Sequence, residues 1–135
     1  MQMELQIPDT YNRHGCRGRT SVELVVVDGA NTLQLVLDDE GDTAVMVLLD
    51  GHKATVLARE CGAFAAGERG LDTTIQVYDS DGWPDRYTLR VGPSKFADLL
   101  SLTATCKTAE WTVLVNDAQA GRASWAISRF VAVAG

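Results

Sequence analysis

The feature that most constrains this chain is an internal echo: residues 33–64 align with residues 75–106 without a gap. Each segment reads as a strand, an acidic turn, a second strand and a helix, which predicts an α+β fold built from two similar strand-turn-strand-helix units. Two unrelated hairpin-and-helix units could give the same pattern, because few of the aligned residues are identical. The positions that match in type are Leu33 and Ile75, Gln34 and Gln76, Leu35 and Val77, Asp39 and Asp81, Val47 and Leu89, Lys53 and Lys95, and Leu57 and Leu99.

The first unit has clear strand and helix signals. Residues 21–26 and 33–38 alternate apolar and polar side chains around the turn 28–31, which predicts a β-hairpin. Residues 44–49 are apolar on both faces, so this strand is expected to be covered twice or buried at an interface. Asp50 is a good N-cap for the helix that follows. Its predicted buried face is Ala54, Leu57, Ala58, Cys61 and Ala65, and Gly67 and Gly70 end it.

The second unit is expected to follow the same order. Residues 73–78 and 86–91 predict a hairpin joined by an acidic loop, and Pro93 opens a predicted helix that places Leu99 in the core like Leu57. Residues 111–115 and 124–133 predict two closing strands. The total is about seven mostly antiparallel strands with two helices on one face, in a single α+β domain over residues 21–135.

Residues 1–20 read as an N-terminal basic arm. Residues 11–20 contain Arg13, Arg17 and Arg19 and no acidic residue, so they carry a charge of +3. Because the net charge of the chain is −6, all other residues together carry −9. Arginine suits bidentate pairing with carboxylates, so these three are candidate partner-binding residues for a neighbouring copy or another protein. The same arm could bind nucleic acid, or it could be a solvated tail.

Linear motifs for metals and catalysis are weak. Asp79, Asp81 and Asp85 match a fragment of a calcium loop without its closing glutamate, so their predicted role is turn geometry. His14 and Cys16 form the one short-spaced pair of zinc-ligand types. The nucleophile-elbow, phosphate-loop and dinucleotide motifs are absent from the sequence. We predict no catalytic residue, metal or cofactor, although carboxylates assembled in space leave no linear trace.

Three tryptophans and three cysteines complete the candidates. Trp83 stands in a loop and is a candidate partner-binding anchor, unless its ring packs back over the hairpin. Trp111 and Trp125 alternate with polar residues and are expected in the core. The cysteines lack tight spacing, which indicates reduced thiols, and Cys61 and Cys106 are expected to be small buried apolar residues at helix ends.

The stretch from Tyr87 to Phe130 reads as strand, helix, strand, turn and strand. In that order it resembles a piece of a DNA sliding-clamp domain, which is also built from repeated strand-helix-strand units. This fold-level likeness covers about a third of the chain and implies an association with nucleic acid.

These observations give three functional hypotheses. The leading one is a non-catalytic structural or interaction protein that self-associates into a homo-oligomer or docks on a protein partner, such as a phage structural or accessory protein or a small inhibitor. The alternative is a nucleic-acid-associated module that uses the arm, and the third is a small ligand-binding protein or enzyme. No apolar run is long enough to span a membrane and no signal peptide is visible, so the expected location is the cytoplasm or a virus particle.

Overall fold

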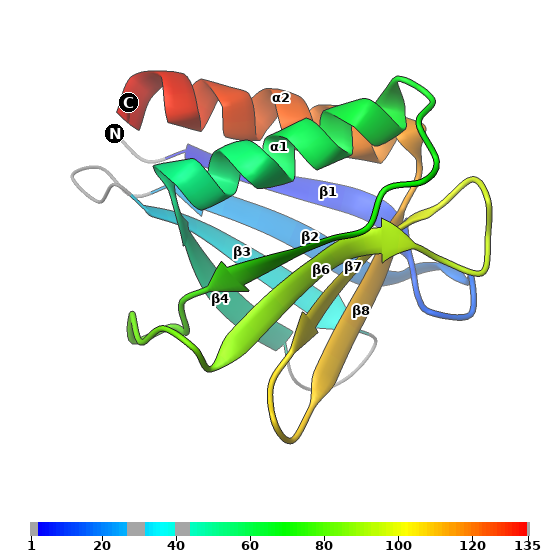
Figure 1. Cartoon of the computed structure of the whole chain (residues 1–135). Coiled ribbons are helices and arrows are strands. Elements are labelled where there is room, and N and C mark those ends of the chain that lie inside the picture. The colour runs from blue at the N-terminus through cyan, green and yellow to red at the C-terminus, as the bar shows by residue number, and fades with distance from the viewer. Residues whose placement is uncertain (1–2, 27–31, 40–43, 135) are drawn as a thin grey trace.

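The computed structural model describes residues 3–26, 32–39 and 44–134, which contain eight strands and two helices (Figure 1). One antiparallel sheet holds all eight strands in the order β4-β3-β2-β1-β8-β7-β6-β5. The fold is therefore α+β, and its eight strands are close to the predicted number of about seven. The elements are β1 Met3–Tyr11, β2 Arg17–Val26, β3 Thr32–Asp39, β4 Ala44–Asp50, α1 Gly51–Ala65, β5 Thr73–Val77, β6 Tyr87–Pro93, β7 Leu100–Thr105, β8 Glu110–Val115 and α2 Asp117–Ala134.

The sheet curls until its two edge strands meet. The backbone N–H of Leu48 in β4 donates to the carbonyl oxygen of Tyr78 just after β5 at 2.8 Å, and the reverse hydrogen bond is 2.9 Å long. The Tyr78 hydroxyl also donates to the Asp50 carboxylate at 3.2 Å. Both helices lie side by side over one face of this curved sheet (Figure 1). Neither helix, within the described residues, is long and apolar enough to cross a membrane.

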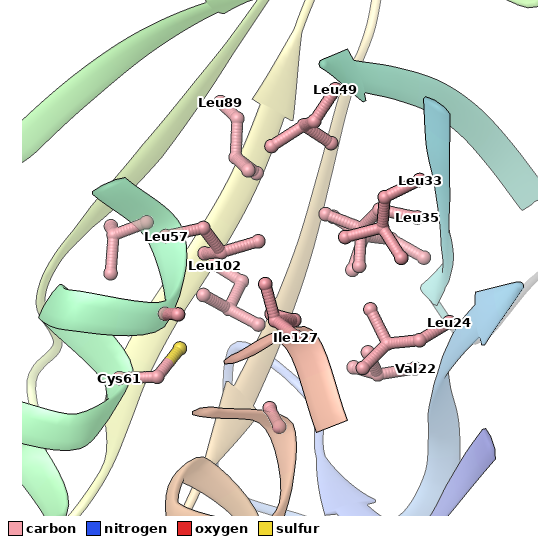
Figure 2. Close-up of a cluster of buried hydrophobic side chains, with 14 of the residues drawn as sticks. Val22, Leu24, Leu33, Leu35, Leu49, Leu57, Cys61, Leu89, Leu102 and Ile127 are labelled. Atoms are coloured by element: carbon pink, nitrogen blue, oxygen red, sulfur yellow. The ribbon is translucent and has the colours of Figure 1, made fainter. Parts of the chain in front are cut away.

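One hydrophobic core fills the space between the inner face of the sheet and the helices. Leucine and valine side chains from both halves of the sheet converge there on Leu57, Cys61 and Ile127 of the helices (Figure 2). In β4 the inward side chains, such as Val47, are fully buried, while Met46 and Leu48 on the outer face are only half-buried. Strand β4 is thus fully covered on its inner face only, so the expectation that the chain covers both of its faces is wrong, and burial of the outer face at an interface stays a prediction.

Small residues bring the two helices close together. A Cβ atom added to Gly62 would lie 2.8 Å from the Ser124 Oγ, so the backbone of α1 approaches α2 where a larger residue would not fit. The Ser124 hydroxyl donates to the carbonyl oxygen of Ala58 at 2.8 Å and ties the pair together.

Each half of the chain contains four strands followed by a helix. Asp50 and Asn116 cap the two helices in the same way, because each side chain accepts a 2.9 Å hydrogen bond from the backbone N–H three residues later. Matching the two caps also aligns buried residues of α1 and α2, namely Ala54 with Ala120, Cys61 with Ile127, and Phe64 with Phe130. The register of the sequence echo is different, since it places α1 over β7.

The predicted second helix is wrong. Residues 94–99 form a loop, and β7 follows with Leu100, Leu102 and Ala104 pointing into the core. These alternate with Ser101, Thr103 and Thr105, which is the period of a strand. Leu99 is half-buried in the loop, so it is not the core equivalent of the fully buried Leu57.

The predicted closing strand over residues 124–133 is also wrong, because these residues belong to α2. Residues 116–121, which are predicted as the turn before this strand, instead form the cap and the first turn of α2. The Asn116 N–H donates to the Gln119 side-chain oxygen at 2.9 Å while the Gln119 N–H donates to the Asn116 side chain. This reciprocal pair is a capping box, which fixes a helix N-terminus.

The N-terminal segment is not a separate arm. Strand β1 lies between β2 and β8, and the predicted boundary at residue 20 falls inside β2. The predicted turn at 28–31 and most of the turn at 38–42 lie outside the described residues.

Polar side chains hold the seam where the two halves join. Strands β1 and β8 share the single register pair Tyr11 and Leu114. Beside it, the Asp39 carboxylate accepts from the Thr112 N–H at 3.0 Å and from the Arg13 guanidinium at 2.8 Å. The Gln119 side-chain amide donates to the carbonyl oxygens of Pro8 and Asp9, each at 2.9 Å. These side-chain hydrogen bonds join the two halves at the seam, as backbone hydrogen bonds join neighbouring strands elsewhere in the sheet.

Candidate functional site

The predicted partner-binding residues do not form one site. Arg13 lies in the turn between β1 and β2 and pairs with Asp39, Arg17 lies 3.5 Å from Asp9, and Arg19 is exposed on β2. Trp83 lies in the loop between β5 and β6, at the other end of the sheet from that turn in Figure 1. Arg13 and Arg17 therefore have carboxylate partners within the chain.

The acidic loop around Trp83 is organised by Asp79. Its carboxylate is buried and accepts from the backbone N–H groups of Asp81 and Trp83, both at 2.9 Å. Arg86 pairs with Asp79 at 3.4 Å and lies 6.0 Å from the Trp83 ring, which is 60% exposed. Asp79 thus shapes the loop, and the described residues contain no group of three or more potential metal ligands.

A cleft of about 740 Å³ opens between the start of β4, this acidic loop and the turn after β7. Cys106 lines it, and the backbone N–H and hydroxyl of Thr108 lower the pKa of its thiol. Tyr87 lines it as well, with a pKa raised first by burial and then by Cys106, and its ring lies 6.2 Å from Trp111. Histidine, the usual base for a nucleophilic thiol, is not among the described lining residues.

Cys61 and Cys106 therefore differ, although both are predicted to be buried at helix ends. Cys61 is buried in α1, and this burial raises the pKa of its thiol to about 12, so the prediction for Cys61 is confirmed. Cys106 is half-exposed in the turn between β7 and β8, so its prediction is wrong.

The solvent-facing side of the helix pair carries a different arrangement. Trp125 of α2 is 63% exposed, and the Arg129 guanidinium lies 4.8 Å from the centre of its ring. Arg122 is exposed three residues before Trp125 on α2, and Arg59 of α1 is exposed where it lines the groove between the two helices. We call these four residues the helix surface.

Acidic residues of the helices offset only one of these arginines, Arg59. Glu60 is buried beside Arg59 at 3.9 Å, and Asp117 at the start of α2 pairs with Arg69 at 3.2 Å. Between the helices runs a groove of about 400 Å³ lined mainly by small residues such as Gly62 and Ser128. The helix surface is therefore a positively charged area around one exposed aromatic ring.

The outer face of β1–β4 has the opposite character. Its ladder aligns Glu4 with Val25, and it aligns Glu23 with Val36 and Met46 across β2, β3 and β4. We call this area, completed by Leu48, the outer patch. The ranges 4–7, 21–26, 32–39 and 44–50 contain no lysine, arginine or histidine, and the exposed Arg17 and Arg19 lie outside them at the start of β2. A hydrogen bond with Glu4, burial and the negative charge of Glu4 all raise the pKa of Glu23.

Sequence reasoning missed the helix surface because it assigned Trp125 to the core of a strand. The signal that reveals it is the helical spacing of Ala120, Ala123, Ile127 and Phe130, which form the buried side of α2. Trp125 and Arg129 fall on the opposite side and are four residues apart, so they are neighbours on the helix.

Comparison of the chain with protein-family models, curated proteins and solved structures finds no match.

Proposed function

We propose that this chain is a non-catalytic interaction protein that self-associates through its helix surface. The observation that carries the proposal is Trp125, a large apolar ring that is 63% exposed among arginines. Tryptophan and arginine are the residue types that dominate the binding energy of protein interfaces. The buried polar side chains of the described residues are satisfied within the chain, since none of their buried nitrogen or oxygen atoms lacks a hydrogen-bond partner.

The charge distribution supports a partner with an acidic surface. The chain has a net charge of −6, and a second copy presents such a surface in its outer patch. Arginine forms planar bidentate pairs with carboxylates, so the exposed arginines of the helix surface suit this kind of contact.

The test is a matched pair of tryptophan substitutions. Trp125→Ala is expected to weaken self-association by about tenfold or more, because aromatic anchors at interfaces contribute about 2 kcal/mol. Trp83→Ala is the control, since Trp83 is 60% exposed and belongs to the loop between β5 and β6, which lies away from the helices in Figure 1. Sedimentation velocity from micromolar to tens of micromolar protein measures both. A wild-type chain that stays monomeric throughout would refute the proposal, and a loss with Trp83→Ala alone would move the interface to the acidic loop.

A second candidate is nucleic-acid binding by the same helix surface. It is favoured by an exposed aromatic ring beside arginines, which can stack on a base while the guanidinium groups contact phosphates. The net negative charge of the chain opposes it. Salt-sensitive binding of single-stranded DNA that is lost in R122E/R129E would favour this candidate.

We also propose that the two halves derive from one unit of four strands and a helix. The matched caps and the matched buried residues of α1 and α2 support this, in a register different from the sequence echo. An experimental structure in which the two halves superpose poorly would overturn it.

A further inference from the structure

The helix surface and the outer patch lie on opposite sides of the molecule. The helices cover the inner face of the sheet, and the ladder places Glu23, Val36 and Met46 together on its outer face. A second copy can therefore approach either surface without blocking the other. If the helix surface of one copy contacts the outer patch of another, the copies form a row. A free outer patch remains at one end of the row and a free helix surface at the other.

The two surfaces are complementary in charge. The helix surface exposes three arginines, whereas the outer patch carries Glu4 and Glu23 and no basic residue, and the exposed Arg17 and Arg19 lie nearer the start of β2. Pairing two helix surfaces face to face would bring arginines against arginines, and like charges across an interface are costly. Opposite charges favour the outer patch of another copy over a second helix surface.

The two surfaces are also complementary in their apolar parts. Val36, Met46 and Leu48 are half-buried on the outer face and form an apolar centre beside the two glutamates. Trp125 supplies an exposed ring in the middle of the arginines. An aromatic anchor seated on aliphatic side chains with charges around it has the layout of an interface core and rim.

From this arrangement we infer that the chain assembles head to tail, with the helix surface of one copy seated on the outer patch of the next. Trp125 packs on Val36, Met46 and Leu48, and Arg122 and Arg129 pair with Glu4 and Glu23. This inference rests on the proposed function and names the partner surface. A heterologous contact of this kind builds a ring if the rotation between copies closes, and a filament if it does not.

The test uses two charge-reversed variants of the full chain. R122E/R129E disables the helix surface and keeps the outer patch, whereas E4K/E23K does the reverse. Each variant alone is expected to associate at least about tenfold more weakly than the wild type. An equimolar mixture is expected to restore association, because the intact helix surface of one variant meets the intact outer patch of the other, and the two reversed surfaces are again opposite in charge.

The controls reverse the same number of charges at other exposed positions. K95E/K107E matches the first variant, and E68K/D98K matches the second, in change of net charge. Both controls are expected to assemble like the wild type. Circular dichroism confirms that every variant is folded, and mass by light scattering gives the assembly state.

The outcomes separate the two proposals. If E4K/E23K assembles like the wild type while R122E/R129E does not, the helix surface binds elsewhere and head-to-tail assembly is refuted, but self-association stands. If mixing the variants restores nothing although each alone is impaired, head-to-tail assembly is also refuted. If the wild type is monomeric, the proposed function fails and this inference fails with it.

Discussion

The two halves of the sheet share one inner face but have different outer faces. Strands β1–β4 present aliphatic side chains and glutamates outward, such as Val36, Met46 and Glu23. The outward positions of strands β5–β8 are rich in hydroxyl groups, namely Thr74, Thr88, Ser101, Thr103, Thr105 and Thr112. Arg90 on that second face makes two hydrogen bonds of 2.8 Å to Asp72 of its own chain.

This difference shows where the fold constrains the sequence and where it does not. Inward positions must fill one shared volume, so leucine and valine recur there in both halves. Substitutions at outward positions affect solubility and partner binding but leave the fold of the sheet unchanged. The second half pairs its outward Arg90 with Asp72 of the same chain, whereas the first half presents an apolar and acidic outer patch.

The largest expected effect tests whether the two inner faces form one core. Leu35→Ala in β3 and Leu102→Ala in β7 are each expected to lower the free energy of unfolding by about 2–5 kcal/mol, because both leucines are almost fully buried. Urea denaturation measures both. A cost below about 1 kcal/mol for one of them alone would mean that the two halves are not packed as one unit.

The next largest effect is expected at the seam, where side-chain hydrogen bonds join the two halves of the sheet. Asp39→Ala removes the acceptor for the Thr112 N–H and for Arg13, so it is expected to lower the free energy of unfolding by about 1–3 kcal/mol. Asp38→Ala, at the neighbouring outward position, is the control and is expected to change stability by less than about 0.5 kcal/mol. Equal effects of the two substitutions would contradict the role of Asp39.

The contact between the two edge strands predicts a pH dependence. The Lys53 N–H, and after it the Tyr78 hydroxyl, lower the pKa of Asp50 in the folded chain. Ionised Asp50 therefore adds stability above its unfolded pKa, and this contribution is lost as the pH falls through the lower folded pKa. Asp50→Asn is expected to cost at most about 1 kcal/mol at neutral pH, since asparagine can still cap α1. Thermal melts should show this difference shrinking below about pH 4, and a constant difference would contradict it.

The smallest effects on stability are expected on the outer faces. Thr103→Val in β7 and Met46→Thr in β4 should each change stability by about 0.5 kcal/mol or less, because both positions are only half-buried. Met46→Thr should nevertheless weaken self-association, whereas Thr103→Val should not. A sedimentation experiment that shows equal association for both would remove the functional difference between the two faces.

The sequence predicts the elements from β2 to α1 well because their signals are local, but it misses β1, which it assigns to a basic arm. The alternation in residues 33–38, the Asp50 cap and the spacing around Leu57 each specify one element, and the structure contains all three. In the second half, Pro93 with the leucines that follow suggests a helix where β7 forms. The pairing of β7 with both β6 and β8 is a tertiary contact that decides the outcome.

The candidate site was harder to predict from sequence for a related reason. The residues next to Trp125 in the sequence are compatible with a strand and with a helix. The capping box of Asn116 and Gln119 decides in favour of the helix. Arg13 and Arg17 stand out by composition, yet their carboxylate partners become visible only once the strands are paired. Charge counts along a chain therefore do not identify which charges remain available to a partner.

The bond between Gln119 and the first strand has a consequence during protein synthesis. Strand β1 leaves the ribosome well before β8 and Gln119, which complete its second edge. Until they emerge, β1 can pair only with β2, so the edge next to β8 stays open to other nascent chains. A ribosome that stalls before β8 would release a product in which β1 is an unpaired edge, and aggregation is the expected fate of that product.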